Sequence, residues 1–415
     1  MLKWGQLHFS LKMAQEAAEI KKADRRSGRI YFFITFVFRI TLWGERNCVF
    51  GMQRGWIFMK KVIVAPLNWG LGHATRCIPI IDELLRQGAE VIIASDGEAL
   101  ALLRKEYPGL EVLRLPGYGI RYWSDSMMLN IGLQLHKVLW GVVREHLFLR
   151  RFLKGHAVDA VISDNRYGFF SRRVKSVFMT HQLNIRAPGV LLRWLVQRVN
   201  HFFIGRFDAC WVPDFEGAMS LAGELSRNDL GGKMEVRYLG MLSRMKRYST
   251  VLVYDLIVVL SGPEPQRSIF EGLVMGQLKG MGELLPRCLV VRGVVGEGEV
   301  YYWHESGHVE VCNYLLGLEL NEKLLQSDLV LCRSGYSSLM DLAVLGLRAV
   351  LVPTPGQTEQ EYLAEMLREK GVFNGQFQSE LDIGRGVKDK DFFSGLVGFG
   401  GTNDELAGII EGLIE

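Results

Sequence analysis

From Met59 onward, the chain alternates short runs of β-branched and apolar residues with longer segments of helical periodicity. This alternation constrains the fold more than any other feature, because parallel strands need crossover connections and those connections are usually helices. Two such series occur, separated by a polar, basic stretch at residues 243–250. The sequence therefore predicts an α/β protein with two Rossmann-like, doubly wound parallel-sheet domains that face each other across a cleft.

The expected elements divide between the two domains. In the first, strands are expected at 62–66, 91–95, 112–115, 158–163, 177–180 and 209–212, with helices at 74–87, 127–153 and 190–203. In the second, strands are expected at 256–260, 289–291, 309–312, 329–332 and 349–352, with helices at 337–345 and 359–369. The predicted domains are 59–245 and 250–385, followed by a C-terminal tail or helix at 386–415.

Residues 1–58 differ in character from the rest of the chain. Several lysines and arginines precede an apolar run at 30–43, which is too short for the roughly 20 residues that span a bilayer. The sequence Met59-Lys60-Lys61 leads straight into the first strand. Residues 1–58 are therefore expected to lie outside the fold, either as an upstream extension from a wrongly placed start or as a loose membrane-associating tail.

Cysteine use and charge narrow the class of protein. The 6 cysteines include no C-x-x-C pair, so neither a zinc site nor a disulfide framework is indicated, and a cytoplasmic location is expected. The first predicted domain is strongly basic and the second strongly acidic. The basic domain should face an anionic partner, such as a phosphorylated acceptor or an acidic membrane surface, whereas no nucleic-acid partner is expected.

A glycine-rich loop directly follows the first expected strand. It contains Asn68, Gly70, Gly72 and His73, and its spacing is not that of the dinucleotide fingerprint, because Thr75 occupies the third glycine position. Two glycines allow a sharp turn and a close approach of the backbone to a ligand. His73 at the start of the next helix can take a proton from an attacking hydroxyl, or it can serve only as a helix cap.

Polar residues also follow two later strands of the first domain. Asp164 comes after the strand at 158–163, where it can orient His73, act as the base itself, or simply form an Asx turn or a helix cap. The segment 181–184 follows the next strand, and its His181 and Asn184 are expected to line the same cleft, with the same structural alternative.

The second domain carries candidate residues for binding a diphosphate, a ribose and a sugar. Small residues ahead of an expected helix, accompanied by arginine, fit a diphosphate. A carboxylate within a helix can accept both hydroxyls of a ribose, and polar residues opening the next helix can bind a sugar. The residues concerned are Ser261, Gly262 and Arg267; Arg333, Ser334 and Gly335; Asp341; and Gln360 and Glu361. Taken singly, each also fits a turn, a cap or a solvated face.

Residues 59 to about 372, and 327–372 above all, resemble the family-28 glycosyltransferases, in a less characterised bacterial and archaeal branch. The resemblance implies the GT-B architecture, with a UDP-sugar held mainly by the C-terminal domain. It places Ser261 and Gly262 near the diphosphate, and Ser334 and Gly335 in the R-S-G turn. Asp341 falls where the family has a ribose-binding glutamate.

The same resemblance assigns the sugar-binding and acceptor-side positions. Gln360 matches the first of two sugar-binding glutamines, and Glu361 replaces the second. Gly70, Gly72 and His73 match the N-domain loop. Residues 181–184 resemble an H-E-Q-N segment in which Gln182 replaces the acidic residue.

The resulting expectation is a metal-independent, inverting transfer of a hexose or N-acetylhexosamine from a UDP-sugar to an acceptor hydroxyl. No cofactor is expected, and Asp389-Lys390-Asp391 is interpreted as a solvated loop rather than a metal site. A nucleotide-sugar epimerase and a non-catalytic nucleotide-sugar or glycan-binding protein remain the alternatives. The acceptor is left open, with a lipid-linked cell-envelope glycan as one form of it.

Mixed aromatic, aliphatic and basic residues at 121–123, 135–154 and 190–206 predict either a peripheral site on the inner face of the cytoplasmic membrane or ordinary core packing.

Overall fold

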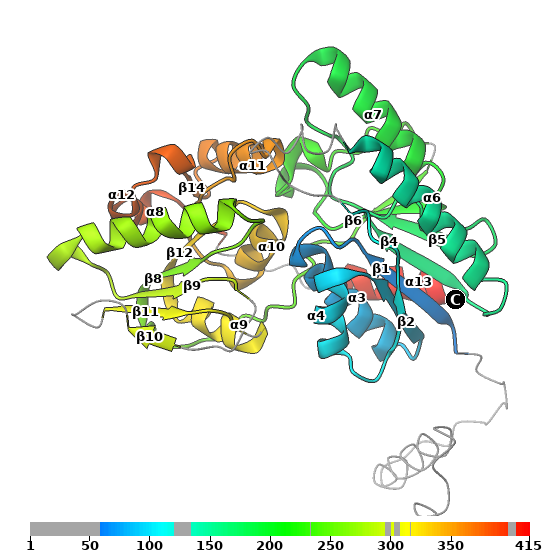
Figure 1. The fold of residues 1–415 in the computed structure, drawn as a ribbon, viewed down its shortest axis with the longest axis horizontal. Coiled ribbons are helices and arrows are strands. Elements are labelled where there is room, and N and C mark those ends of the chain that lie inside the picture. The colour runs from blue at the N-terminus through cyan, green and yellow to red at the C-terminus, as the bar shows by residue number, and fades with distance from the viewer. Residues whose placement is uncertain are drawn as a thin grey trace, which may run out of the picture. The chain divides into compact units, whose positions relative to one another are not determined.

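The computed structural model describes residues 59–119, 134–232, 234–294, 300–302, 308–315, 317–396 and 404–415. The chain divides into two units, residues 1–58 and 59–415. The predictions for residues 1–58 and for 121–123 therefore lie outside the described residues. Within the second unit, the chain forms two lobes, each built on one sheet (Figure 1).

The first lobe is built on a seven-stranded sheet in the order β3-β2-β1-β4-β5-β6-β7. Every neighbouring pair in it is parallel. The strands are β1 (Lys61–Pro66), β2 (Glu90–Ser95), β3 (Glu111–Arg114), β4 (Ala160–Asp164), β5 (Lys175–Met179), β6 (Ala209–Val212) and β7 (Glu235–Tyr238). The register pairs Pro66 with Asp164, so the carboxyl ends of β1 and β4 meet.

Helices cover both faces of this sheet because alternate strand residues are apolar on both sides. Val62 and Val64 pack toward α3 (Leu71–Arg86) and α4 (Gly97–Glu106). Ile63 and Ala65 pack toward α6 (Leu135–Phe152), and Phe178 of β5 packs toward α7 (Val190–Ile204). Short 3-10 turns lie at Gly217–Met219 and Gly223–Leu225.

The second lobe repeats this plan in the order β10-β11-β9-β8-β12-β13-β14. All pairs are parallel except β10 with β11, which is antiparallel at the sheet edge. The strands are β8 (Tyr254–Val259), β9 (Cys288–Val291), β10 (Val300–Tyr302), β11 (Val309–Cys312), β12 (Ser327–Cys332), β13 (Ala349–Leu351) and β14 (Asn374–Gly375).

One face of the second sheet is covered by α8 (Gln266–Gly280) and α12 (Ile383–Lys388), and the other by α9 (Gly317–Leu325), α10 (Tyr336–Leu345) and α11 (Thr358–Glu369). Short 3-10 turns lie at Gly282–Leu284, Gln378–Glu380 and Lys390–Phe392.

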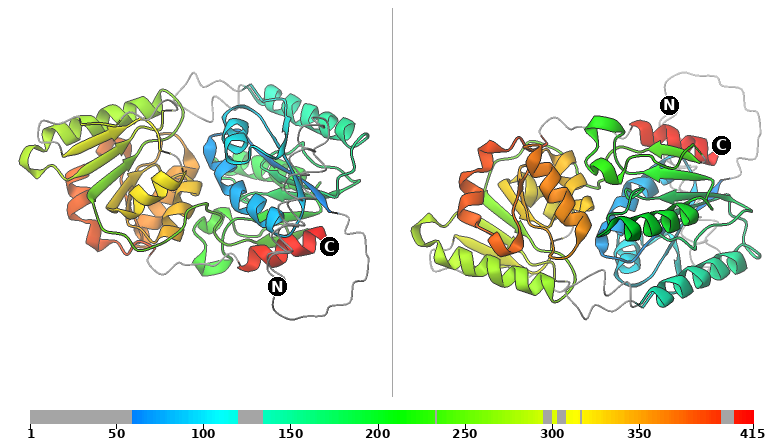
Figure 2. Two further views of the ribbon diagram at one scale, coloured as in Figure 1. Left: turned by 90° about the horizontal axis from the view of Figure 1, so that it is seen from below. Right: turned by 90° about the horizontal axis from the view of Figure 1, so that it is seen from above.

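The last helix, α13 (Asp404–Ile414), belongs in space to the first lobe. It lies beside that lobe in both views of Figure 2. Gln87 at the end of α3 donates to the Ala407 carbonyl at 2.8 Å, and Lys175 of β5 donates to the Gly412 carbonyl at 2.8 Å. The buried core that contains α13 also includes residues of the second lobe, so one apolar cluster runs through both lobes.

The predicted fold is confirmed: two parallel-sheet α/β domains in which each series of expected strands forms one sheet. The predicted helix at 74–87 begins earlier than expected, at Leu71, because Gly70 adopts a φ of 83° and turns the chain into the helix. Three further strands, β7, β10 and β14, were not expected. Each is an edge strand of two to four residues, which is too short to carry a clear periodic signal.

Candidate functional site

The candidate site lies at the carboxyl ends of the first-lobe strands, where α3 begins. His73 lies in the first turn of α3, and Asp164 is the last residue of β4. The His73 Nδ1 atom is 3.1 Å from the Asp164 Oδ2 atom. The two residues are 91 positions apart in the sequence and meet because β1 and β4 are neighbours.

Burial and charge set the protonation state of both groups. Asp164 is fully buried, and its side chain binds Arg76 and His73. Burial alone would raise the pKa of Asp164, but Arg76 and His73 hold that pKa well below its usual range, so the carboxylate is ionised. Burial lowers the pKa of His73 from 6.5, with Asp164 opposing and Arg76 reinforcing the effect. His73 is therefore neutral at neutral pH, as a general base requires.

Arg76 lies one helical turn after His73 and is 2% exposed. Its Nε donates to Asp164 Oδ2 at 2.8 Å, and its Nη2 donates to Asp164 Oδ1. The same Nη2 lies 2.8 Å from His73 Nδ1, so that ring nitrogen faces a donor and an acceptor. In the tautomer that carries its proton on Nδ1, His73 donates to Asp164 and keeps a lone pair on Nε2 for a substrate proton.

His181 connects this group to the second lobe. Arg76 Nη1 is 3.1 Å from His181 Nδ1, and His181 Nε2 is 2.7 Å from Glu359 Oε1 at the start of α11. The other oxygen of Glu359 accepts from Gln182. The Tyr336 ring stacks on His181 with centroids 4.1 Å apart, and its hydroxyl donates to the Pro213 carbonyl. The predicted acceptor-side histidine therefore lies at the junction of the two lobes.

Two helices begin at this junction. A Cβ placed on Gly72 would lie 2.5 Å from Ser337 Oγ, so the first turn of α3 touches the first turn of α10. Neither helix has a side-chain cap on its N-cap residue, Gly70 or Gly335. Unpaired backbone N–H groups and the positive ends of two helix dipoles meet here, and this arrangement attracts anions.

The predicted donor-side residues surround the start of α10 and α11. Ser334 is fully buried and its hydroxyl donates to the Gln360 carbonyl at 2.8 Å. The Gln360 side-chain carbonyl accepts from Thr354 N at 2.8 Å, and its Nε2 lies 3.9 Å from a Cβ built on Gly335. The structure thus brings Ser334, Gly335 and Gln360 together.

The Ser261–Gly262 turn is exposed after β8, immediately before α8. Gly262 has a φ of 110° and nothing within 4 Å of an added Cβ. A side chain there would be strained but not crowded, so the turn leaves open space beside its backbone.

Asp341 lies within α10 and is partly buried. Its Oδ1 accepts from Ser243 Oγ at 2.5 Å. Ser243 belongs to the segment that joins the lobes. Burial raises the pKa of Asp341 to about 6, although Ser243 and Arg244 act in the opposite direction. The carboxylate is not sealed in the apolar core, and it is ionised above that pH.

The two arginines predicted to bind the diphosphate, Arg333 and Arg267, both make contacts within the second lobe. Arg333 is buried and donates to the carbonyls of Val352, Pro353 and Gln266 and to the Gln378 side chain, over the ring of Phe270. Arg267 pairs with Glu264 at 2.6 Å and Glu271 at 2.7 Å. Arg333 therefore cross-links the lobe from inside, and two carboxylates already neutralise the charge of Arg267.

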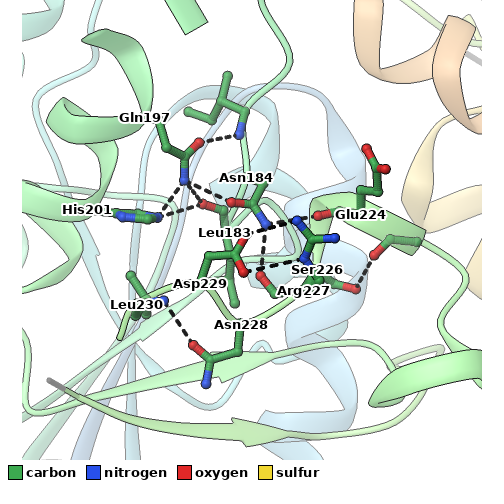
Figure 3. A network of polar contacts seen from close by, with 12 residues as sticks. Leu183, Asn184, Gln197, His201, Glu224, Ser226, Arg227, Asn228, Asp229 and Leu230 are labelled. Carbon is green, nitrogen blue, oxygen red and sulfur yellow. Dashed lines mark hydrogen bonds and ion pairs between the residues drawn. The ribbon is translucent and has the colours of Figure 1, made fainter. Parts of the chain in front are cut away.

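Three further predicted residues also have structural bonding. Asn184 donates to the Glu224 and Arg227 carbonyls and accepts from Gln197, and so holds the loop shown in Figure 3. Asn68 accepts from Ala99 N at the start of α4. Glu361 accepts from Gly356 N, next to α11. These contacts orient the site's loops and leave the side chains partly or fully occupied.

Sequence reasoning gave no role to Arg76, Glu359 or Tyr336. A usable signal existed for Arg76, because a residue three positions after His73 shares its helix face. Glu359 and Tyr336 gave no signal, since their partners come from the other lobe. Among the residues that the structure describes, no three or more His, Cys, Asp or Glu side chains are grouped to hold a metal ion.

Comparisons with known proteins agree with this architecture. Residues 299–388 match the glycosyltransferase family 28 C-terminal domain. An "uncharacterized glycosyltransferase" of Methanosarcina acetivorans is 25% identical over 337 residues, covering 75% of this chain and 82% of that protein. A "UDP-N-acetylglucosamine--N-acetylmuramyl-(pentapeptide) pyrophosphoryl-undecaprenol N-acetylglucosamine transferase" of Haemophilus ducreyi is 22% identical over 320 residues, covering 73% of this chain and 81% of that protein.

Solved structures show the same fold at low identity. The glycosyltransferase of kitacinnamycin superposes with a TM-score of 0.59 at 15% identity, covering 86% of this chain and 99% of that one. The calicheamicin glycosyltransferase CalG4 gives a TM-score of 0.59 at 13% identity, covering 86% of this chain and 98% of that one. The fold is therefore GT-B, as the resemblance implied.

Proposed function

We propose that this chain is a family-28-like glycosyltransferase that moves a hexose or N-acetylhexosamine from a UDP-sugar to an acceptor hydroxyl with inversion at the anomeric carbon. The similarity to transferases whose names specify a UDP-sugar supports the choice of donor. No metal or cofactor is part of the proposal.

One observation carries this proposal. A neutral histidine, His73, contacts a buried carboxylate, Asp164, at the start of α3, and the adjacent Gly72 touches Ser337 at the start of α10. A base with its orienting carboxylate thus lies beside two uncapped helix N-termini that attract phosphate. Transfer of a diphosphate-linked sugar to a hydroxyl needs both parts at one place.

In the proposed step, the acceptor oxygen forms a bond to the anomeric carbon while the bond from that carbon to the diphosphate oxygen breaks. His73 Nε2 takes the acceptor proton, and Asp164 stabilises the resulting imidazolium through Nδ1–H. The nucleoside diphosphate leaves with the electron pair. Asp164 serves as the orienting residue, because it is buried and both its oxygens bind Arg76.

The donor is proposed to lie over the starts of α8, α10 and α11. The Ser261–Gly262 turn and the α10 N-terminus would bind the diphosphate through backbone N–H groups. Asp341 would accept the ribose hydroxyls through the oxygen that Ser243 does not use. The Gln360 NH₂ group would bind a hydroxyl of the sugar, and Glu361 would stand beside it.

For the acceptor, we propose a hydroxyl on a lipid-linked glycan, presented at the inner face of the cytoplasmic membrane. On α7, residues such as Leu191, Trp194 and Phe202 are exposed, and Arg193 and Arg198 accompany them. An exposed apolar face mixed with arginine suits an anionic membrane interface. In the described part of the chain, no helix combines the length and apolarity needed to cross a bilayer.

Replacement of the base tests the function. The variant His73→Gln should lose transfer by about 10² to 10⁴ in kcat, the usual contribution of a general base, while UDP affinity measured by calorimetry stays near the wild-type value. The matched control is His156→Gln, since His156 is exposed, stacks on Phe152 and has its Nδ1 3.0 Å from the Phe152 carbonyl oxygen. Turnover in His73→Gln equal to that of the control would remove His73 as the base.

The donor is identified by a panel of UDP-, GDP- and dTDP-sugars in a thermal-shift assay, because a bound ligand raises the melting temperature by mass action. The anomeric configuration of the product, read by NMR, tests inversion. Retention of configuration, or isomerisation of the sugar without an acceptor, would contradict the proposal.

A further inference from the structure

Arg76 is buried yet makes contacts in three directions. Its Nε donates to Asp164 at 2.8 Å, its Nη2 contacts His73 at 2.8 Å, and its Nη1 lies 3.1 Å from His181. Burying a guanidinium is costly unless its donors are satisfied. This arginine therefore fixes the positions of three polar side chains from three different segments of the first lobe.

The contact with Arg76 also fixes which nitrogen of His181 carries the proton. His73 Nδ1 faces both Arg76 and the Asp164 carboxylate, but the hydrogen bond of His181 Nδ1 is to Arg76 alone among the described residues. Because a guanidinium can only donate, His181 Nδ1 accepts, and the proton lies on Nε2. That Nε2–H donates to Glu359 Oε1 at 2.7 Å. The stacked Tyr336 ring, 6° from parallel, holds the imidazole in this plane.

Glu359 brings the second lobe into the same network. It lies in the first turn of α11, directly before Gln360, and its second oxygen accepts from Gln182. Burial would raise the pKa of Glu359, but His181 and Arg76 hold it below its usual value, so the side chain is an anion facing the first lobe. The helix turn that carries the sugar-side residue Gln360 thus also contacts the group that surrounds His73.

We propose that Arg76, His181 and Glu359 form a positioning link between the lobes. When α11 of the second lobe is in place, this link holds His73 and Asp164 in the geometry that the reaction needs. Arg76 and Glu359 are positioning residues, since Arg76 acts through His73 and Asp164, and Glu359 acts through His181. The inference rests on the proposed function for its kinetic consequence, but the link itself can be measured without turnover.

Electrostatics give the link a distinctive signature. The charged or titratable groups around His73 are Arg76 on α3, Asp164 on β4, His181 after β5 and Glu359 on α11. Loss of the negative Glu359 should lower the pKa of His73 if the lobes hold that carboxylate nearby. Arg76→Lys keeps the positive charge but cannot contact three partners at once. It should therefore displace the side chains of Asp164, His73 and His181 while it leaves the net charge of the group unchanged.

The experiment is an NMR titration of ¹⁵N-histidine in the full chain, which reports the pKa and the tautomer of His73; the His73 signals are assigned with His73→Gln. Glu359→Gln should lower the pKa of His73. The matched control Glu365→Gln, an exposed glutamate on the same helix, should leave that pKa unchanged. Arg76→Lys should change the tautomer ratio of His73, whereas Arg86→Lys, exposed on the same α3, should not.

Kinetics supply the second readout. Glu359→Gln should reduce kcat by about tenfold or more, as expected for a displaced catalytic group, and Glu365→Gln should not. The link is overturned if the pKa of His73 is the same in Glu359→Gln and Glu365→Gln, or if that pKa changes while kcat stays at the wild-type value.

If Arg76→Lys fails to fold, as judged by its circular dichroism and melting temperature, Glu359→Gln decides the question, because the Glu359 side chain is only partly buried and glutamine has nearly the same size. If the wild type transfers no sugar at all, the proposed function fails, whereas the NMR arm still accepts or rejects the link.

Discussion

His73 must be neutral before the proposed step and charged after it, and its neighbours act on these two states in opposite ways. Burial and Arg76 favour the neutral ring, whereas Asp164 favours the imidazolium. The pair of opposite charges around one histidine keeps the base available at neutral pH and still stabilises its protonated form. The nearby Arg76 also prevents Asp164 from taking up the proton itself, because it holds the carboxylate ionised.

Single residues were predictable from the sequence where strand order alone placed them. His73 and Asp164 each follow or end a strand, so adjacent carboxyl ends of a parallel sheet bring them together. Arg333 follows a strand in the same way, but its side chain turns inward to four oxygens. Sequence position indicates the end of the sheet, but not the direction in which a long side chain turns.

Asp341 leads to a prediction about pH. Because burial raises the pKa of Asp341 to about 6, the carboxylate takes up a proton as the pH falls through 6 and loses the acceptor that we propose for the ribose hydroxyls. Donor affinity should therefore fall below pH 6 in the wild type. Asp341→Asn should bind the donor about tenfold or more weakly at pH 8 and lose this pH dependence, as measured by calorimetry.

Asp341→Asn should weaken donor binding but should not lower the stability of the fold. A folded-state pKa above the unfolded value of 3.8 means that this group's contribution to the free energy of unfolding decreases as pH rises from about 4 to about 6. Asp341→Asn should therefore be at least as stable as the wild type at pH 8. A large loss of stability there would instead assign Asp341 a structural role.

At the scale of elements, the signal was strongest for buried strands and weakest for edges. β1 and β12 were expected because their apolar runs pack on both faces. β7, with the sequence EVRY, has alternating exposed and half-buried residues, so its pattern resembles an ordinary loop.

The helix α7 was expected, but its sequence did not decide between a core helix and a surface helix. The structure decides this, since its buried residues are Asn200 and Ile204 alone.

The exposed face of α7 leads to a prediction about membranes. Trp194 is 56% and Phe202 60% exposed, and Arg198 and Arg206 lie over these two rings. The double variant Trp194→Asp/Phe202→Asp should reduce binding to phosphatidylglycerol vesicles by about tenfold or more, because each ring contributes roughly 1.5–3 kcal/mol when buried. Cosedimentation measures the binding, and high salt should weaken the wild type as well.

The control for that experiment is Phe392→Asp, since Phe392 is 79% exposed on the second lobe, away from α7. Equal vesicle binding by the double variant and this control would reject a membrane role for α7. The acceptor would then be sought among soluble hydroxyl compounds.

On the scale of the whole molecule, the two lobes share one apolar cluster, to which the end of the chain contributes. Leu406, Ile410 and Leu413 of α13 are buried with residues of α3 and of the second lobe. The sequence predicted a tail or helix at 386–415, but nothing local in it indicates that the chain returns to the first lobe. That packing depends on a surface formed by residues more than 300 positions earlier, as the bond from Gln87 to Ala407 shows.

The return of α13 predicts that the last residues stabilise the first lobe. Ile410 is completely buried, so Ile410→Ala should lower the free energy of unfolding by about 2–5 kcal/mol. Glu411→Ala, one position further on and exposed, is the matched control and should change the free energy of unfolding little.

Removal of residues 397–415 should have a larger effect and separate the calorimetric unfolding into two transitions, with the first lobe melting earlier. Retention of a single transition at the wild-type melting temperature would mean that α13 is not part of the cooperative core, and that the first lobe is stable without it.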